Sequence, residues 1–281
     1  MSDGGARGGP VATLRSALFW LWQIVTTLVM GAPVLIAGAF SYDLGFRLAL
    51  VWIRANVHGL RVICGVRWEV DGRENIPEKP CLVLSKHQST WETYFLAMLF
   101  SPCVYVAKRS LVWVPIFGWV LWVLRFILID RKSGRSAVEQ MVAQARDRLA
   151  RGRWVIVFPE GTRRAVGAPP SYRIGGAIVA SRTGADILPV ATNSGEFWPR
   201  LGFVKHPGTI TVSILPPIGA AGRDPDALIA ETEARIEGRM AEISGRGPVA
   251  PERLRGAEAG GAATGPGNAA GTGKATPGHE P

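Results

Sequence analysis

The sequence predicts an α/β domain with a mostly parallel sheet flanked by helices, preceded by an N-terminal membrane-embedded helical segment. After residue 66, short apolar runs alternate with helical patterns, which is typical of a parallel sheet covered by helices. Before residue 66, the chain contains a stretch without a charged side chain, residues 17–40. That stretch is long enough to cross the roughly 30 Å hydrocarbon core of a bilayer.

The N-terminal region divides into two segments of different character. In the uncharged stretch 17–40, Pro33 interrupts the apolar run, so both a clean membrane span and a re-entrant helical hairpin remain open. In the next segment, Arg47, Arg54 and Arg61 recur every seven residues, which places them near one helical face. This pattern indicates an interfacial helix whose cations meet lipid phosphates. A solvated face of a soluble helix is the alternative.

The remaining elements follow from apolar runs and helix-start signals. Strands are predicted over seven ranges, 68–70, 81–84, 104–107, 126–129, 154–158, 187–191 and 210–215. The clearest helical patterns cover 136–150 and 225–243. The second helix begins at Asp224-Pro225, a helix start with proline in the first position. The predicted organisation is therefore a flexible N-terminus, membrane-anchoring helices, an α/β domain and a disordered Gly/Ala/Pro-rich tail, over residues 1–13, 14–66, 67–244 and 245–281.

The composition narrows the choice of partners. The chain of 281 residues carries 32 Lys+Arg against 22 Asp+Glu, a net charge of +10. A basic balance suits nucleic acid or an anionic membrane. The basic residues are thinly spread and the aromatic residues fall inside apolar runs, which favours anionic membrane lipid and argues against nucleic acid. The three cysteines show no CxxC spacing and the chain has only four histidines, so neither a disulfide framework nor a metal site is expected.

The stretch CLVLSKHQSTWETYFL places His87 between a predicted strand and a predicted helix. Ligands of open α/β sheets bind at this end of a strand. Glu92 meets His87 only if the histidine lies outside the helix, and a carboxylate in that position orients an imidazole that acts as a base. The alternative is structural, because Ser89 and Glu92 also fit a capping box, in which the glutamate only satisfies the start of the helix.

Two further stretches carry candidate ligands for a phosphate. In WVIVFPEGTRR, a buried strand leads into Glu160, Gly161, Thr162 and Arg163. Such a turn suits a substrate with hydroxyls and a phosphate, and a plain surface turn with an ion pair is the alternative.

In AKRSLVWVPIFGWVLWVLRFILIDR, Lys108 follows one strand and Arg131 closes another, and both are natural phosphate ligands. The Trp-rich run between them is broken by Pro115, Gly118 and Arg125. We favour a membrane-facing or acyl-binding element there, with a second transmembrane helix and a plain core helix and strand as alternatives.

Taken together, KHQSTWE, the strand ending in IDR, FPEGTR and ILPVA occur in the order of the four blocks of the glycerolipid acyltransferase superfamily. Over roughly residues 60–220 the chain most closely resembles the bacterial lysophosphatidic acid (1-acylglycerol-3-phosphate) O-acyltransferases. The resemblance implies that His87 is the general base and Glu92 its orienting acid. It also implies that the acceptor lysophospholipid is bound by the second and third blocks, through Lys108, Arg131, Glu160, Gly161, Thr162 and Arg163.

The implied activity is transfer of an acyl chain from acyl-CoA or acyl-acyl carrier protein to the sn-2 hydroxyl of lysophosphatidic acid, giving phosphatidic acid. It needs no covalent acyl-enzyme, no metal and no cofactor beyond the thioester co-substrate. A cytoplasmic active site at the inner membrane is expected, because thioester donors are cytoplasmic. Acylation of another lysolipid, hydrolysis of acyl esters and a non-enzymatic lipid-binding module are the alternatives, and the absence of a G-x-S-x-G serine argues against the hydrolase. Two positions depart from the family pattern, since Glu92 stands where Asp is usual and Arg125 where Gly is usual.

Overall fold

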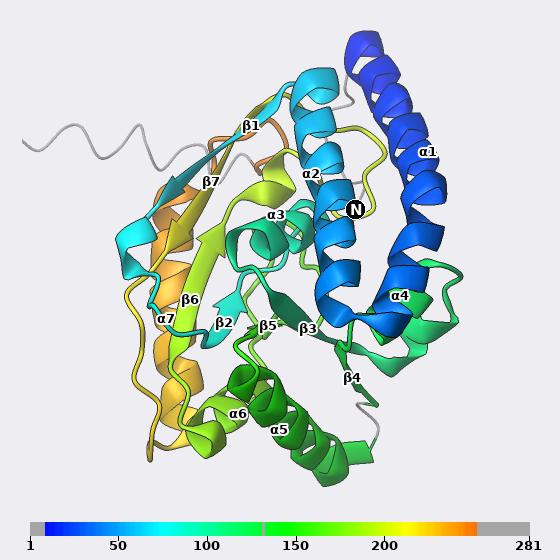
Figure 1. The fold of residues 1–281 in the computed structure, drawn as a ribbon. Helices are drawn as coiled ribbons and strands as arrows, with labels where there is room; N and C mark the ends of the chain where they lie inside the picture. The colour runs from blue at the N-terminus through cyan, green and yellow to red at the C-terminus, as the bar shows by residue number, and fades with distance from the viewer. Residues whose placement is uncertain (1–8, 131–132, 252–281) are drawn as a thin grey trace, which may run out of the picture.

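A seven-stranded sheet organises the part of the chain described by this computed structural model, residues 9–130 and 133–251 (Figure 1). The strands lie in the order β1-β7-β6-β2-β5-β3-β4. Their bounds are β1 Val66–Asp71, β2 Leu82–Ser85, β3 Cys103–Lys108, β4 Ile127–Ile129, β5 Trp154–Val157, β6 Ile187–Thr192 and β7 Gly208–Ile214. Each predicted strand therefore exists, with ends that differ by one or two residues in most cases.

The sheet is mostly parallel, as predicted. Of the paired neighbours, β6 and β7 alone run antiparallel among the described strands. Every residue of β2, β5 and β6 is buried, as expected of strands covered on both faces. The carboxyl ends of these three adjacent strands face the same edge of the sheet, because β2 pairs in parallel with both β5 and β6. That edge is where ligands bind in open α/β sheets.

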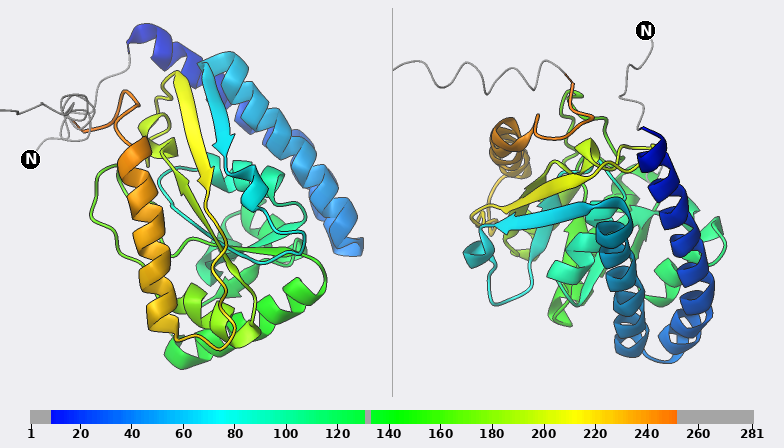
Figure 2. Two further views of the ribbon diagram at one scale, coloured as in Figure 1. Left: turned by 90° about the vertical axis from the view of Figure 1, so that its left-hand side faces the viewer. Right: turned by 90° about the horizontal axis from the view of Figure 1, so that it is seen from above.

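Helices cover both faces of the sheet, with α2 and α3 on one side and α5, α6 and α7 on the other (Figure 2). The bounds are α1 Pro10–Phe40, α2 Tyr42–Cys64, α3 Trp91–Leu99, α4 Phe117–Val123, α5 Gly134–Ala150, α6 Gly175–Thr183 and α7 Pro225–Ile243. The start of α7 follows the predicted signal, since the Asp224 side chain accepts a hydrogen bond from the Ala227 N–H.

An antiparallel hairpin of α1 and α2 forms the N-terminal region (Figure 1). The uncharged stretch is one continuous helix, because α1 runs through Pro33 and the chain reverses only at Ser41. A re-entrant hairpin within residues 17–40 is therefore not what this structure contains. The two helices approach closely, since a Cβ on Gly45 would lie 2.5 Å from the Gly38 Cα. By length and composition α1 is apolar enough to cross a membrane.

Both predicted flexible ends are corrected where the structure describes them. Helix α1 begins at Pro10, inside the range 1–13 predicted to be flexible, because proline at the first position lacks only an N–H that a helix leaves unpaired anyway. Residues 245–251 begin the predicted tail, yet the buried Glu196 carboxylate accepts N–H groups from Gly245 at 2.8 Å and Gly247 at 2.6 Å. The remainder of both segments, residues 1–8 and 252–281, lies outside the described residues.

The Trp-rich run forms two short helices instead of a transmembrane span. A 3-10 helix, η2 Arg109–Trp113, is followed by α4, with Pro115 between them. Helix α4 packs against α1, where a Cβ on Gly38 would lie 2.8 Å from Val123. The Trp113 and Trp122 side chains remain 86% and 65% exposed. The favoured prediction is a membrane-facing or acyl-binding element, and the first of these is compatible with this exposure.

Candidate active site

His87 lies in the turn between β2 and α3, at the carboxyl edge of the central strands. The strand ends at Ser85 and the helix begins at Trp91, so the histidine is outside the helix, as the prediction required. The turns that follow β5 and β6 reach the same edge, because both strands flank β2 in parallel. Three segments that are far apart in the sequence therefore meet around this histidine.

The Glu92 carboxylate holds the His87 ring directly. Glu92 Oε1 lies 2.9 Å from His87 Nδ1, and the glutamate is 1% exposed. Because a carboxylate accepts and does not donate, Nδ1 carries the proton and Nε2 is left free to accept one. The same Oε1 also accepts the N–H groups of Gln88 at 2.8 Å and Ser89 at 2.7 Å. One carboxylate therefore makes both the contact expected of a helix cap and the contact expected of a residue that orients the imidazole.

Aromatic packing limits the orientation of the imidazole. The His87 ring stacks on Phe158 with a centroid distance of 3.8 Å and an interplanar angle of 11°. Phe158 in turn stacks on Tyr105 of β3 at 5.9 Å. The His87 side chain keeps 15% of its surface exposed, so the ring is fixed yet reachable.

Glu160 of the third block contacts the backbone of His87 and is 3% exposed. Its Oε2 accepts the His87 backbone N–H at 2.8 Å, and its Oε1 lies 2.9 Å from Lys86 Nζ. Lys86 also contacts Glu237 Oε1 of α7 at 2.7 Å. Burial raises the pKa of Glu160, and Lys86 opposes that shift. In this arrangement Glu160 holds the histidine turn, whereas the family resemblance implied direct acceptor binding.

The rest of the third block faces the site more openly. Gly161 adopts a φ of +69°, a conformation that glycine takes without strain, and Thr162 is exposed. Arg163 is half-buried and donates from Nη1 to Thr90 Oγ1 at 2.6 Å. The Arg164 N–H closes the turn on the His87 carbonyl at 2.8 Å. The first and third blocks are therefore bonded to each other at several points.

Of the two predicted phosphate ligands of the second block, the structure describes only Lys108. Lys108 is exposed at the end of β3, and its register partner across the sheet is Ile129 of β4. The lysine is therefore beside the strand that leads to the IDR motif. Arg131 lies outside the described residues.

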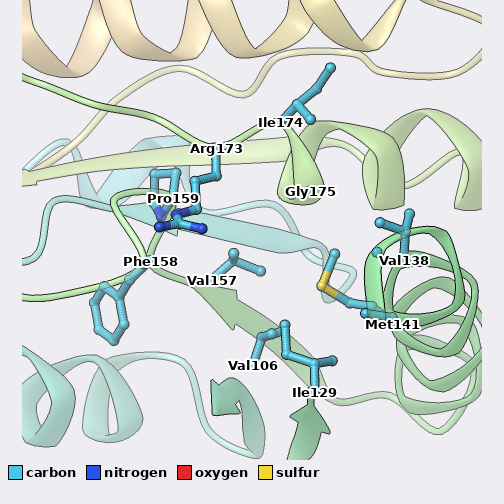
Figure 3. Close-up of a pocket in the computed structure, with 14 residues that line it drawn as sticks. Val106, Ile129, Val138, Met141, Val157, Phe158, Pro159, Arg173, Ile174 and Gly175 are labelled. Atoms are coloured by element: carbon cyan, nitrogen blue, oxygen red, sulfur yellow. The ribbon is translucent and has the colours of Figure 1, made fainter. Parts of the chain in front are cut away.

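A cavity of about 390 Å³ lies beside Phe158, and Figure 3 shows the residues that line it. Most of its lining is apolar and comes from strand ends of β3–β5 and from α5, including Val106, Ile129, Val138, Met141 and Val157. Arg173 lines the cavity as well. Phe158 lines this cavity and also stacks on His87, so one aromatic ring connects the cavity with the histidine.

Sequence reasoning assigned no role to several residues that the structure brings to the site. Ser194 donates from Oγ to Glu92 Oε2 at 2.7 Å, and Lys86 pairs with Glu160. Lys86 directly follows the buried strand β2, and Ser194 lies two residues after the buried strand β6. Their position after a buried strand is a sequence signal, but it does not say which residues they contact. Within residues 9–130 and 133–251, no group of three or more His, Cys, Asp or Glu side chains has the arrangement of a metal site.

Comparisons with known proteins agree on one family. Residues 67–193 match the family model described as Acyltransferase. The chain is 44% identical over 240 residues to a 1-acyl-sn-glycerol-3-phosphate acyltransferase of Pseudomonas aeruginosa, covering 83% of this chain and 93% of that protein. It is 32% identical over 170 residues to the mouse 1-acyl-sn-glycerol-3-phosphate acyltransferase alpha, covering 59% and 60% of the two chains.

A solved structure shares the fold. The crystal structure of the 1-acyl-sn-glycerophosphate (LPA) acyltransferase from Thermotoga maritima superposes with a TM-score of 0.67 at 22% identity. The match covers 83% of this chain and 97% of that one. At this level of identity the likeness concerns the fold.

Proposed function

The chain belongs to the acyltransferase family that contains the 1-acyl-sn-glycerol-3-phosphate acyltransferases, and from this premise we propose that it acylates the sn-2 hydroxyl of lysophosphatidic acid. The product is phosphatidic acid, and the acyl donor is a thioester, acyl-CoA or acyl-acyl carrier protein. The single observation that carries the proposal is the His87–Glu92 contact at the carboxyl edge of the sheet. It provides a general base, which the reaction needs.

The reaction proceeds by direct transfer. His87 Nε2 takes the proton of the acceptor hydroxyl as that oxygen attacks the thioester carbonyl carbon. The new C–O bond forms, the C–S bond breaks, and the imidazolium returns the proton to the departing thiolate. Glu92 stabilises the imidazolium in between, and general-base catalysis of this kind contributes about 10²- to 10⁴-fold in rate.

Cations at the site edge support a phosphate-bearing acceptor. Arg163 uses Nη1 for Thr90, and its guanidinium carries further N–H donors that fit a phosphate. We assign the same task to Lys108 and, from the family resemblance, to Arg131. Holding the phosphate places the hydroxyl near the imidazole, which lowers the entropic part of the barrier.

The apolar cavity beside Phe158 supports an acyl chain as the transferred group. Its lining of branched aliphatic side chains and Met141 suits a hydrocarbon chain. The shared Phe158 would place a carbonyl near His87 while the chain extends between the sheet and α5. Acyl-CoA and acyl-acyl carrier protein present the same thioester group, so the transfer step is the same for both donors.

A membrane location supports a lipid acceptor. Helix α1 exposes large apolar side chains along its length, including Leu14, Leu21, Leu28 and Ile36. Helix α4, which carries the exposed Trp119 and Trp122, lies against the C-terminal part of α1 (Figure 1). Arg47, Arg54 and Arg61 of α2 are exposed, as interaction with anionic lipid requires. We propose attachment to the inner membrane with the active site on its cytoplasmic face, where thioester donors are made.

The test is acyl transfer to lysophosphatidic acid by purified wild type and His87→Ala, with labelled acyl-CoA and acyl-acyl carrier protein in parallel. We expect turnover with at least one donor and its loss in a folded, membrane-bound His87→Ala. Arg163→Ala is expected to raise KM for lysophosphatidic acid more than for a phosphate-free monoacylglycerol. Wild-type turnover only with other lysolipids would contradict the proposed acceptor. Failure with every donor and lysolipid would favour a lipid-binding module.

A further inference from the structure

Ser194 reaches the catalytic carboxylate from a different part of the fold. It opens the short 3-10 helix η4 Ser194–Glu196, which follows the end of β6 at Thr192. Its side chain is fully buried. The hydroxyl donates to Glu92 Oε2 at 2.7 Å, across 102 positions of sequence. This is the hydrogen bond that the structure gives to Oε2, whereas the His87, Gln88 and Ser89 contacts all go to Oε1.

The segment around Ser194 is held firmly against the histidine turn. The Asn193 side chain donates to the Ile243 carbonyl at 2.9 Å and accepts the Thr211 N–H at 2.9 Å. A Cβ on Gly195 would lie 2.7 Å from the Gln88 Cβ, so the absence of a side chain there permits the close approach. The hydroxyl of Ser194 is therefore supplied by a rigid element, which is what positioning a carboxylate requires.

We propose that Ser194 is a positioning residue for the His87–Glu92 pair, a role that rests on the acyl transfer proposed above. By fixing Oε2, the hydroxyl sets the rotation of the carboxylate, so that Oε1 points at the imidazole. The donated hydrogen bond also stabilises the negative charge of the carboxylate, so the carboxylate attracts the imidazolium proton less strongly. The turn after β6, at the end of the fourth block, thereby contributes to catalysis without touching the substrate.

The pH profile of the enzyme depends on the titratable groups that surround the Glu92 carboxylate. They are His87 from its own turn and Tyr105 from β3, whose pKa burial raises well above the usual value. The tyrosine is therefore neutral in the working range. Glu160 accepts the His87 backbone N–H and pairs with Lys86. A change confined to Ser194 leaves this set of titrating groups intact.

The experiment compares Ser194→Ala with Ser194→Thr, which retains a hydroxyl. We expect Ser194→Ala to lower kcat by about tenfold with little change in KM, because the substrate contacts are intact. The acid limb of its kcat/KM profile should move up by about half a pH unit, because the carboxylate has lost a donor. Ser194→Thr should recover part of the lost kcat and return the acid limb toward the wild-type position.

A matched control is available two residues away. Thr192 is also fully buried, and its Oγ1 has no hydrogen-bond partner among the described residues. Thr192→Val removes this hydroxyl at nearly constant shape, so kcat and the pH profile should stay at wild-type values. If Ser194→Ala and Thr192→Val behave alike, the hydroxyl has no specific role and the proposal is wrong.

A readout without turnover separates this proposal from the reaction itself. The chain has four histidines, so ¹⁵N-histidine NMR of the detergent-solubilised protein is tractable, with His87→Ala identifying the His87 signal. We expect Ser194→Ala to raise the titration midpoint of His87, whatever the acceptor lipid. An unchanged midpoint would overturn the positioning role. A shifted midpoint in a protein that does not acylate lysophosphatidic acid would count against the acceptor alone.

Discussion

Glu92 does two jobs at once. Its carboxylate receives the imidazole N–H and the two amide groups that precede α3, all on Oε1, and the Ser194 hydroxyl on Oε2. A side chain that caps a helix start is already fixed by the backbone, so the same bonds pre-orient it for the histidine. The structural role and the proposed catalytic role therefore require the same residue.

Shortening the Glu92 side chain should separate its capping of the helix start from its contact with the imidazole. In Glu92→Asp, the variant that matches the usual family residue, the carboxylate recedes by about 1.5 Å, one carbon–carbon bond. It then cannot keep both the His87 contact and the Ser194 bond at their present lengths. We expect kcat to fall by about tenfold or more with KM nearly unchanged, measured by steady-state transfer to lysophosphatidic acid.

The control for that variant is Glu231→Asp on α7, where the glutamate pairs with Arg223 and Arg235 at the surface. It makes the same chemical change away from the site and should leave kcat intact. Wild-type turnover in Glu92→Asp would mean that the turn adapts to the shorter acid, and the length argument would fail.

Much of the site could be anticipated at the residue scale, because its signals are local. The contact between His87 and Glu92 follows from a histidine in a strand-to-helix turn and an acid in the first helical turn. The roles of Ser194 and Lys86 could not be anticipated, because each depends on which strands are neighbours in the sheet. The placement of Glu160 behind His87 depends in the same way on β5 lying beside β2.

Among the elements, the end of α4 places Arg125, which stands where the family resemblance implies glycine, in a conformation that suits glycine. The Phe126 N–H bonds to the Leu121 carbonyl and the Arg125 N–H to the Trp122 carbonyl, both at 3.0 Å, which is the Schellman pattern of helix termination. That pattern puts Arg125 in the left-handed region, at a φ of +57°. An L-residue with a Cβ is strained there, and glycine is not.

Replacing Arg125 with glycine should therefore stabilise the fold. We expect a gain of about 1 kcal/mol in the free energy of unfolding, which corresponds to a rise of about 2–4 °C in Tm for a domain of this size. Differential scanning fluorimetry in detergent measures the shift. Arg125→Ala removes the same charge and keeps a Cβ, so it should lack the gain. Equal Tm values for the alanine and glycine variants would contradict the strain argument.

Element types were predicted more readily than their packing. Seven apolar runs became seven strands, because strands buried on both faces have nearly continuous apolar sequence. Pro33 is a position where the local sequence allows the helix to break, yet α1 continues through it and packs along α2. The Trp-rich run gave the opposite result, since Pro115 does separate η2 from α4. In both cases tertiary contacts decided between outcomes that the local sequence permits.

At the scale of the whole molecule, Lys205 joins the N-terminal helix to the α/β domain. The lysine precedes β7 and is only 1% exposed. Its backbone N–H donates to Ser16 Oγ of α1 at 2.8 Å, and its Nζ lies 3.7 Å from the centre of the Trp20 ring and 4.9 Å from that of Trp198. Lysine is normally exposed, so this junction could not be anticipated from the sequence.

The junction should make stability depend on pH. Burial lowers the pKa of Lys205 from its ordinary value of 10.5 to about 7, although the aromatic rings attract the ammonium and offset part of that cost. Between these two values the unfolded chain binds a proton that the folded chain has released, so the free energy of unfolding increases as the pH rises. In Lys205→Met this contribution is absent, and the methionine fills an apolar site.

We therefore expect the Tm difference between wild type and Lys205→Met to change in favour of wild type from pH 6.5 to pH 9. The two proteins are compared at the same pH, so the titration of groups that both contain cancels in the Tm difference. Lys79→Met, at an exposed position, should track wild type throughout. If the Lys205→Met difference is flat with pH, the ammonium remains charged in its aromatic surroundings. The rings would then outweigh burial, and the attachment of α1 to the domain would depend on a cation–π contact over the whole range.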